Sequence, residues 1–212
     1  MTSATEAETR QQLEEDLRLE AERTNQIEGK DGEIAKAEAE GGRLGAVLAA
    51  THSEVAERKA EHAALEARLY DLLIDGDTET TTLAAAKAIQ GSAALLATGT
   101  GKLKHLTENR LPAQRLRVLT PMKERAVLVL DRAAIRSRVH ASQLLLAVLP
   151  AGAIGGDLSI KSEMSARLAH EESQAAYDLE QANAALENEL ALQRKIRDAR
   201  KNIGPITYTN PS

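Results

Sequence analysis

The sequence predicts an all-α protein, an elongated coiled-coil helical hairpin that forms a stalk and carries a small helical head. The 212 residues include no Phe or Trp and only three Tyr, so the bulky side chains that fill thick cores are scarce. Charged residues make up 28% of a chain rich in Ala, Leu, Glu and Arg, which is typical of long helices. Apolar residues near both ends recur at the spacing of a coiled-coil seam.

Residues 1–40 are predicted to form an acidic N-terminal helix. Ser3 and Thr5 are each followed three residues later by Glu, the capping-box pattern in which a hydroxyl and a carboxylate bind free backbone amides. Residues 1–75 hold 18 acidic residues against 9 basic ones. The glycines at positions 41, 42 and 45 each weaken a helix by about 1 kcal/mol relative to Ala, so a bend or break is expected there.

Residues 41–76 are predicted to form one half of a coiled-coil stalk, paired with residues 157–203. Alternating steps of three and four residues define a seam that starts before Gly41. Its members are Ile34, Ala37, Gly41, Leu44, Leu48, Thr51, Val55, Arg58, His62, Leu65, Leu69 and Leu72. Gly76, between Asp75 and Asp77, is free to adopt the left-handed conformation that closes a helix.

Residues 77–156 are predicted to form a basic and apolar head. A helix is expected over 80–97, capped by Asp77 or Thr78 and ended by the Thr and Gly residues at 98–101. Its expected core is 83–86 and 93–96, and a linker containing Pro112 follows. Thr120 and Pro121 then predict a second helix start, with a helix over 121–149. Its expected buried residues are Val127, Leu130, Ala134, Ala141, Leu145 and Val148.

A short β-hairpin over 115–130 is the alternative for this part of the head. Residues 115–119 largely alternate between polar and apolar, and residues 126–130 form a short apolar run. The helix is favoured, because helical periodicity continues to Val148.

Residues 157–203 are predicted to form the second half of the stalk, followed by an extended tail at 204–212. Lys195, Arg197, Arg200 and Lys201 lie in the last turns, where positive charge suits the helix dipole, and Gly204 with Pro205 ends the helix. The predicted seam consists of Met164, Leu168, Ala175, Leu179, Ala182, Leu186 and Leu190.

No pattern in the sequence predicts catalysis, a cofactor or a metal. None of the five His residues follows a Glu by three positions, and there is no Cys, so neither a di-iron site nor a thiolate site is expected. Gly99 to Lys102 lacks the spacing of a phosphate-binding loop. We therefore expect a protein that is not an enzyme, with no catalytic, cofactor-binding or metal-binding residues.

The basic stretch over 102–138 is the first candidate for function. It holds ten Lys and Arg residues against three acidic residues, and such charge supports sequence-independent binding to phosphates. The candidate anion-binding residues are Lys102, Lys104, Arg110, Arg115 and Arg117. The alternative is that these bases pair with the acidic arm, in the same chain or in a neighbouring copy.

An apolar segment is the second candidate. Leu144, Leu145, Leu146, Val148 and Leu149 are the candidate membrane-active residues, and a buried head core is the alternative reading. The N-terminus has no apolar signal-peptide core. The longest stretch without Asp, Glu, Lys or Arg, residues 139–156, contains His140, Pro150 and three Gly, so it is not expected to form an ordinary spanning helix of roughly 20 apolar residues. A cytoplasmic or virion location is therefore expected.

The leading functional hypothesis is a non-enzymatic structural or assembly protein that acts as a homo-oligomer, together with other proteins of a larger particle. Thin helices with Ala-rich seams bury little surface alone, which favours self-association. In general character the chain resembles the small helical components of phage virions. The alternatives are a membrane-active helical protein, such as an ejection or pore component that meets an anionic membrane, and a packaging protein that binds nucleic acid.

Overall fold

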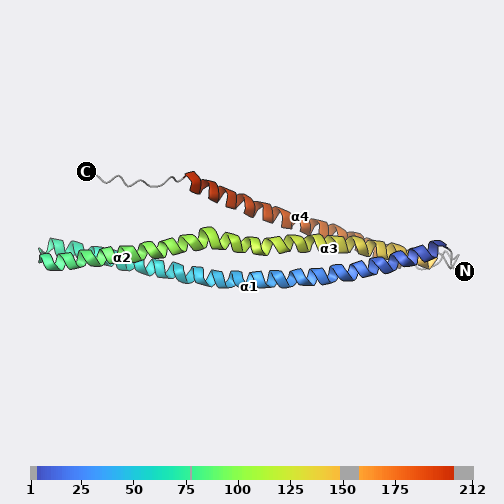
Figure 1. Ribbon diagram of the computed structural model, residues 1–212, viewed down its shortest axis with the longest axis horizontal. Coiled ribbons are helices and arrows are strands. Elements are labelled where there is room, and N and C mark those ends of the chain that lie inside the picture. The colour runs from blue at the N-terminus through green and yellow to red at the C-terminus, as the bar shows by residue number, and fades with distance from the viewer. Residues whose placement is uncertain (1–3, 77, 149–157, 203–212) are drawn as a thin grey trace. The chain divides into compact units, whose positions relative to one another are not determined.

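A computed structural model describes residues 4–76, 78–148 and 158–202, and it is all-α throughout these ranges (Figure 1). The chain runs through α1 (Ala4–Ile74), α2 (Glu79–His105), a π-helical turn η1 (Leu106–Arg110), α3 (Leu111–Val148) and α4 (Leu158–Asn202). None of the described residues lies in a strand, so the β-hairpin alternative over 115–130 is wrong and the predicted all-α class is confirmed. Residues 203–212, which include the predicted tail, lie outside the described residues.

The chain forms two compact units. Residues 38–115 form one, called here the hairpin unit, and residues 1–37 with 116–212 form the other, called the bundle unit. The predicted head, residues 77–156, is divided between them. The stalk predicted between residues 41–76 and 157–203 would join the two units and stays a prediction, whereas the structure gives residues 41–74 a partner in α2.

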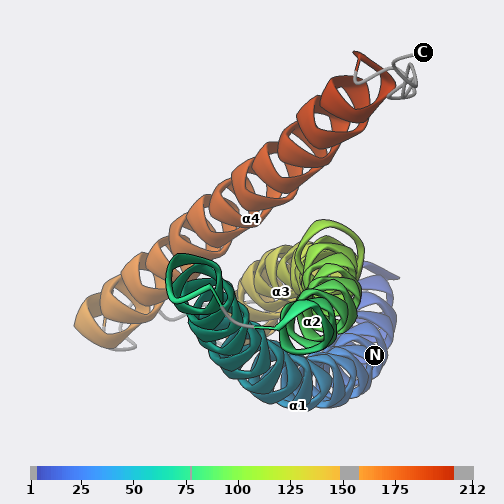
Figure 2. The same cartoon turned by 90° about the vertical axis from the view of Figure 1, so that its left-hand side faces the viewer.

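The hairpin unit turns at Gly76, as the sequence predicts. Gly76 has a φ of 68°, and the Asp75 backbone amide donates to the Asp71 carbonyl at 2.9 Å. Thr78 is the residue that precedes the first turn of α2. The chain then returns antiparallel to α1 (Figures 1 and 2). The predicted class, an all-α helical hairpin, is confirmed, although the second helix of this hairpin is α2 and not the predicted residues 157–203.

The predicted seam of α1 is also confirmed. All twelve positions from Ile34 to Leu72 are buried or half-buried, and of the residues between them only Glu54 is not exposed. The helix continues through the glycines, so the break expected at 41–45 is wrong. Packing overrides the weak helix propensity there, since the seam residues Ala37, Leu44 and Leu48 on either side of the glycines are buried or half-buried.

A matching seam on α2 faces that of α1. It follows the same alternating spacing through Thr82, Ala85, Ile89, Ser92, Leu96, Gly99, Leu103 and Leu106. A Cβ built on Gly99 would lie 3.1 Å from Val55 Cγ2, which fixes the register. The same register sets Leu72 opposite Thr82. Leu83 and Leu95 were expected in the core, but both side chains are 55% exposed, because each lies beside the seam rather than in it.

The predicted linker after residue 101 is helical. The chain passes from α2 through η1 into α3 without a break, and the Leu111 amide donates to the Leu106 carbonyl, five residues earlier. Pro112 has no amide proton, and its ring would collide with the carbonyl four residues back in a regular α-helix. The wider π turn accommodates Pro112, so the predicted linker does not exist. The predicted helix start at Pro121 is also wrong, because α3 already begins at Leu111 and contains Pro121.

The bundle unit packs α3 against the first part of α1 and against α4. Its buried apolar residues are Ile27, Ala37, Ala126, Ala133, Ile135, Val139 and Ala175. The predicted buried face of α3 is partly wrong, since Val127, Ala141 and Leu145 are exposed while Leu130 and Ala134 are half-buried. The buried face of α3 is wider than a single row of residues, because α3 packs against two helices. This face includes the polar residues His140 and Ser142.

The predicted α4 seam holds from Leu168 to Leu186 and fails at its ends. Leu168, Ala175, Leu179, Ala182 and Leu186 are buried or half-buried, whereas Met164 and Leu190 are exposed. Strict alternation of three and four residues continues instead through Glu189, Gln193 and Ile196, which are buried or half-buried. The prediction chose Leu190 because it is apolar, whereas the buried face of α4 continues at Glu189, three residues after Leu186.

Candidate interaction site

Ion pairs join α1 to α3 along the bundle unit. Acidic and basic groups of residues 16–31 pair with groups of opposite charge in residues 124–138. The pairs are Arg23–Asp131 at 3.6 Å, Lys30–Glu124 at 2.7 Å, Asp31–Arg125 at 2.5 Å, Glu20–Arg136 at 2.5 Å and Asp16–Arg138 at 3.0 Å. The attraction between the acidic arm and the basic stretch is therefore satisfied in part within one chain.

Asp16 is the most deeply buried member of this set, at 1% exposed. Arg138 donates from Nε and Nη2 to the same oxygen, Asp16 Oδ1, at 3.2 and 3.0 Å. The second oxygen, Oδ2, is buried and has no hydrogen-bond partner among the described residues. A buried carboxylate held on one side only depends strongly on its single cation.

Arg136 links three helices. Its Nε donates to Glu20 Oε1 of α1 at 2.5 Å, and its Nη1 donates to Glu171 Oε2 of α4 at 3.4 Å. The hydrogen bond to Glu20 raises the pKa of the Arg136 guanidinium above its ordinary value, against the opposing effect of burial. Arg136 therefore stays charged and holds α1 and α4 to the same turn of α3.

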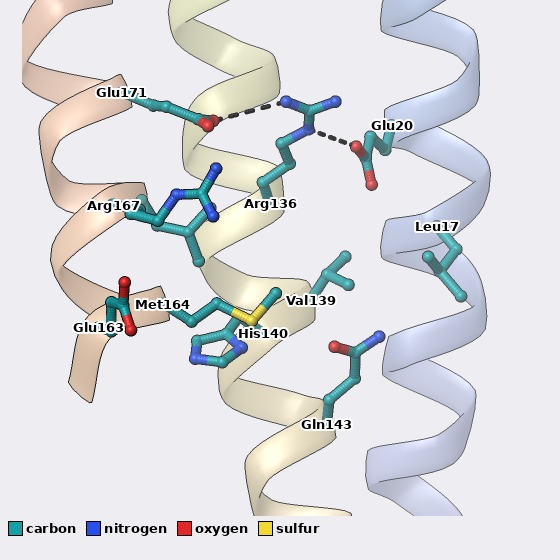
Figure 3. A pocket seen from close by; sticks show the side chains of 11 residues that line it. Leu17, Glu20, Arg136, Val139, His140, Gln143, Glu163, Met164, Arg167 and Glu171 are labelled. Atoms are coloured by element: carbon teal, nitrogen blue, oxygen red, sulfur yellow. Dashed lines mark hydrogen bonds and ion pairs between the residues drawn. The ribbon is translucent and has the colours of Figure 1, made fainter. Parts of the chain in front are cut away.

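A cavity of about 520 Å³ opens beside Arg136, among α1, α3 and α4 (Figure 3). Leu17, Val139, Met164 and Leu168 form its apolar walls. Its remaining lining residues are Glu20, Arg136, His140, Gln143, Glu163, Arg167 and Glu171. The volume falls within the roughly 300–1,000 Å³ that is usual for ligand pockets.

His140 is one of the polar residues that line this cavity. It is 8% exposed, and its Nε2 is buried without a hydrogen-bond partner among the described residues. Met164 reaches from α4 toward its ring, and Arg167 projects from the next turn of α4 (Figure 3). A buried ring nitrogen without a partner loses free energy that a donor or acceptor entering the cavity would restore.

An apolar surface, called here the tip patch, lies beside the turn of the hairpin unit. It consists of Tyr70, Leu73, Ile74 and Leu83, which are 68%, 58%, 81% and 55% exposed. Tyr70, Leu73 and Ile74 are neighbours on one face of α1, three and four residues apart. In the antiparallel register fixed by Val55 and Gly99, Leu83 of α2 lies on the same side of the hairpin.

Acidic residues predominate in the sequence around the tip patch. Residues 66–79 contain five acidic residues and one basic residue, Arg68. The acidic residues are Glu66, Asp71, Asp75, Asp77 and Glu79. A partner for this surface must therefore be apolar and must tolerate or attract carboxylates.

The candidate anion-binding residues do not form one surface in the structure. Lys102 and Lys104 are exposed but lie on opposite sides of the seam residue Leu103, about 200° apart around α2. Lys102 lies near Glu54, whose pKa is lowered mainly by its hydrogen bond to Arg58 and, more weakly, by Lys102. Arg110 and Arg115 belong to the hairpin unit and Arg117 to the bundle unit, and all three are exposed. Anion binding stays a prediction.

The candidate membrane-active residues are partly covered. Leu144 and Leu146 are half-buried, Leu145 is 56% exposed, Val148 ends α3, and Leu149 lies outside the described residues. Within the described ranges, no helix is both long enough and apolar enough to cross a bilayer. Membrane activity also stays a prediction.

The described residues contain no cluster of three or more His, Asp or Glu side chains that could hold a metal ion. Comparison with known protein families, curated proteins and solved structures found no match.

The tip patch and the cavity were not predicted. The tip patch leaves a signal in the sequence, because Tyr70, Leu73 and Ile74 are large apolar residues outside the seam. The cavity leaves none, because it depends on how α4 packs on α3.

Proposed function

We propose that this protein is a non-enzymatic structural or assembly component that acts as a homo-oligomer within a larger particle, and that copies associate through the tip patch. The observation that carries the proposal is the exposure of four large apolar side chains on one side of a single hairpin. Contiguous exposed apolar patches with a polar rim commonly mark sites of protein association. The acidic surroundings of the tip patch provide such a rim.

The magnitude of burial supports this role. Complete burial of a Leu or Ile side chain is worth about 1.5–3 kcal/mol, so Leu73, Ile74 and Leu83, together with the Tyr70 ring, provide enough free energy to offset part of the entropy lost on association. The bundle unit, in contrast, already pairs many of its charges within the chain, which leaves fewer of them to hold copies together.

Sedimentation equilibrium of the whole chain tests the proposal. The unaltered protein is expected to sediment above its monomer mass of 22.8 kDa, with a mass that rises with concentration. A variant with Tyr70→Ser, Leu73→Ser and Ile74→Ser is expected to shift toward 22.8 kDa with unchanged helix content. The proposal is overturned if the unaltered protein remains a monomer at high concentration, or if the variant associates as strongly.

A further inference from the structure

The tip patch needs a partner that is positively charged as well as apolar. Residues 66–79 contain five acidic residues and one basic residue, so two tips in contact would bring like charges together in a partly desolvated interface. The side chains of Asp71 and Asp75 are exposed, and neither forms an ion pair or a hydrogen bond with any described residue. These carboxylates are therefore available to a cationic surface.

The C-terminal end of α4 offers such a surface. Residues 190–201 contain five basic residues and one acidic residue, the reverse of the balance around the tip patch. Leu190, Arg194, Arg197 and Lys201 follow one another at steps of four, three and four residues, so they share one face of the helix, called here the basic face. All four are exposed. Asp198, the acidic residue, lies beside this face.

The cations of the basic face have no partner among the described residues. The side chains of Arg194, Arg197 and Lys201 form no ion pair or hydrogen bond there, unlike Arg136 and Arg138 of α3, which bind carboxylates of α1. Like charges three and four residues apart on a helix repel one another. A surface rich in carboxylates would relieve this repulsion.

We propose that the tip patch of one copy packs against the basic face of α4 in a second copy, with the Tyr70 ring against the guanidinium groups of Arg194 and Arg197. An Arg guanidinium stacks on aromatic rings and binds carboxylates through paired hydrogen bonds. Tyr70 is 68% exposed, and Asp71 and Asp75 lie beside it, so the tip provides both kinds of partner.

The two surfaces also match in length and in apolar character. At about 1.5 Å per residue, the basic face runs about 17 Å from Leu190 to Lys201, and the tip with its carboxylates runs about 14 Å from Glu66 to Asp75. Leu190 and the aliphatic stems of the basic side chains cover the apolar side chains of the tip.

This contact is heterologous, since two different surfaces meet, and each copy at the end of an assembly retains one unused tip or one unused basic face. Repetition therefore gives a ring if the rotation closes and an open filament if it does not. The inference rests on the proposed function, because it specifies which surface of the second copy receives the tip patch.

Exchange of charge between the two surfaces tests the inference. A tip variant, Asp71→Lys with Asp75→Lys, and a face variant, Arg194→Glu with Arg197→Glu, each place like charges opposite one another at exposed positions. Each variant alone is expected to associate about tenfold more weakly than the unaltered protein. An equimolar mixture is expected to recover the average mass of the unaltered protein in sedimentation equilibrium. The reason is that the reversed tip then meets the reversed face, and the unaltered tip meets the unaltered face.

Lys195→Glu is the matched control for Arg194→Glu. The two residues are adjacent and exposed, and the two substitutions make the same change of charge, but Lys195 is turned about 100° from Arg194, away from the basic face. Arg194→Glu should weaken association, whereas Lys195→Glu should leave it within about twofold. Added salt should weaken association of the unaltered protein, whereas contact between two acidic tips would strengthen with salt.

The inference is overturned, and the proposed function kept, if the tip variant associates more strongly than the unaltered protein, as relief of repulsion between two tips would cause. It is overturned equally if the mixture associates as weakly as its two components, or if Arg194→Glu and Lys195→Glu have the same effect. A monomeric unaltered protein would overturn both.

Discussion

Asp16 shows how much one side chain can depend on a single partner. Its carboxylate is buried, and among the described residues only Arg138 donates to it, with both hydrogen bonds made to Oδ1. A carboxylate removed from water needs such a partner, since several kcal/mol of desolvation must be compensated. The alternating spacing of the α1 seam, continued from Ile34 toward the N-terminus, reaches Asp16, whereas most acidic residues of the first helix lie off this line. Its burial follows from the register of α1 against α3.

Replacement of Arg138 by Gln is therefore expected to destabilise the protein by about 2–3 kcal/mol. This cost does not exceed the lower end of the usual range for breaking a buried ion pair, because the Arg138 side chain is half-exposed. Arg10→Gln, which breaks the exposed pair with Glu6, should cost less than about 1 kcal/mol and serves as the control. Urea unfolding followed by circular dichroism measures both. Adding Asp16→Asn to Arg138→Gln should recover part of the loss. Equal effects of the two Arg substitutions would contradict this account of Asp16.

At the scale of the helix pair, Gly99 determines how closely α2 approaches α1. A Cβ at Gly99 would lie 3.1 Å from Val55 Cγ2, closer than ordinary van der Waals contact, whereas a Cβ at Gly101 would meet nothing within 4 Å. The two glycines lie two residues apart on the same helix and differ only in which face they occupy.

Gly101→Ala should stabilise the protein by about 0.5–1 kcal/mol, because Ala restricts the unfolded chain and favours the helix. Gly99→Ala should lose this gain or reverse it, since Val55 must shift to admit the methyl group. In a protein that already carries Val55→Ala, Gly99→Ala should increase stability, because the new methyl group no longer meets the Val55 side chain. Thermal and urea unfolding test the series, and an equal gain at both glycines would refute the close approach.

At the scale of helices, the sequence predicts what periodicity determines and misses what depends on several elements at once. The seam from Ile34 to Leu72 follows from its spacing alone, and so does the turn at Gly76. The continuous passage through Pro112 could not be predicted, because a π turn leaves no recognised mark in sequence. The exposed Val127 and Leu145 were misplaced because α3 packs on two neighbours, and the cavity arises only where the third helix meets them.

At the scale of the whole molecule, few side chains are deeply buried in any one place. Eight apolar residues of the described chain are buried, and four of them are Ala. The seam of the hairpin unit is two helices wide and includes Thr51, Ser92 and Gly99. Such a unit gains little from its own interior. Tyr70, Leu73, Ile74 and Leu83 are the exposed large apolar residues that gather at its turn, which is why self-association through the tip patch is the central proposal of this account.

A comparison of Leu83→Gln with Leu95→Gln tests that central claim most directly. Both residues are Leu, both belong to α2, and both are 55% exposed, but the helical register places Leu83 in the tip patch and Leu95 on the other side of the seam. Sedimentation equilibrium at matched concentrations is the measurement. We expect Leu83→Gln to lower the average mass toward 22.8 kDa and Leu95→Gln to leave it at the value of the unaltered protein. Equal masses for the two variants, or a larger loss with Leu95→Gln, would contradict association through the tip patch.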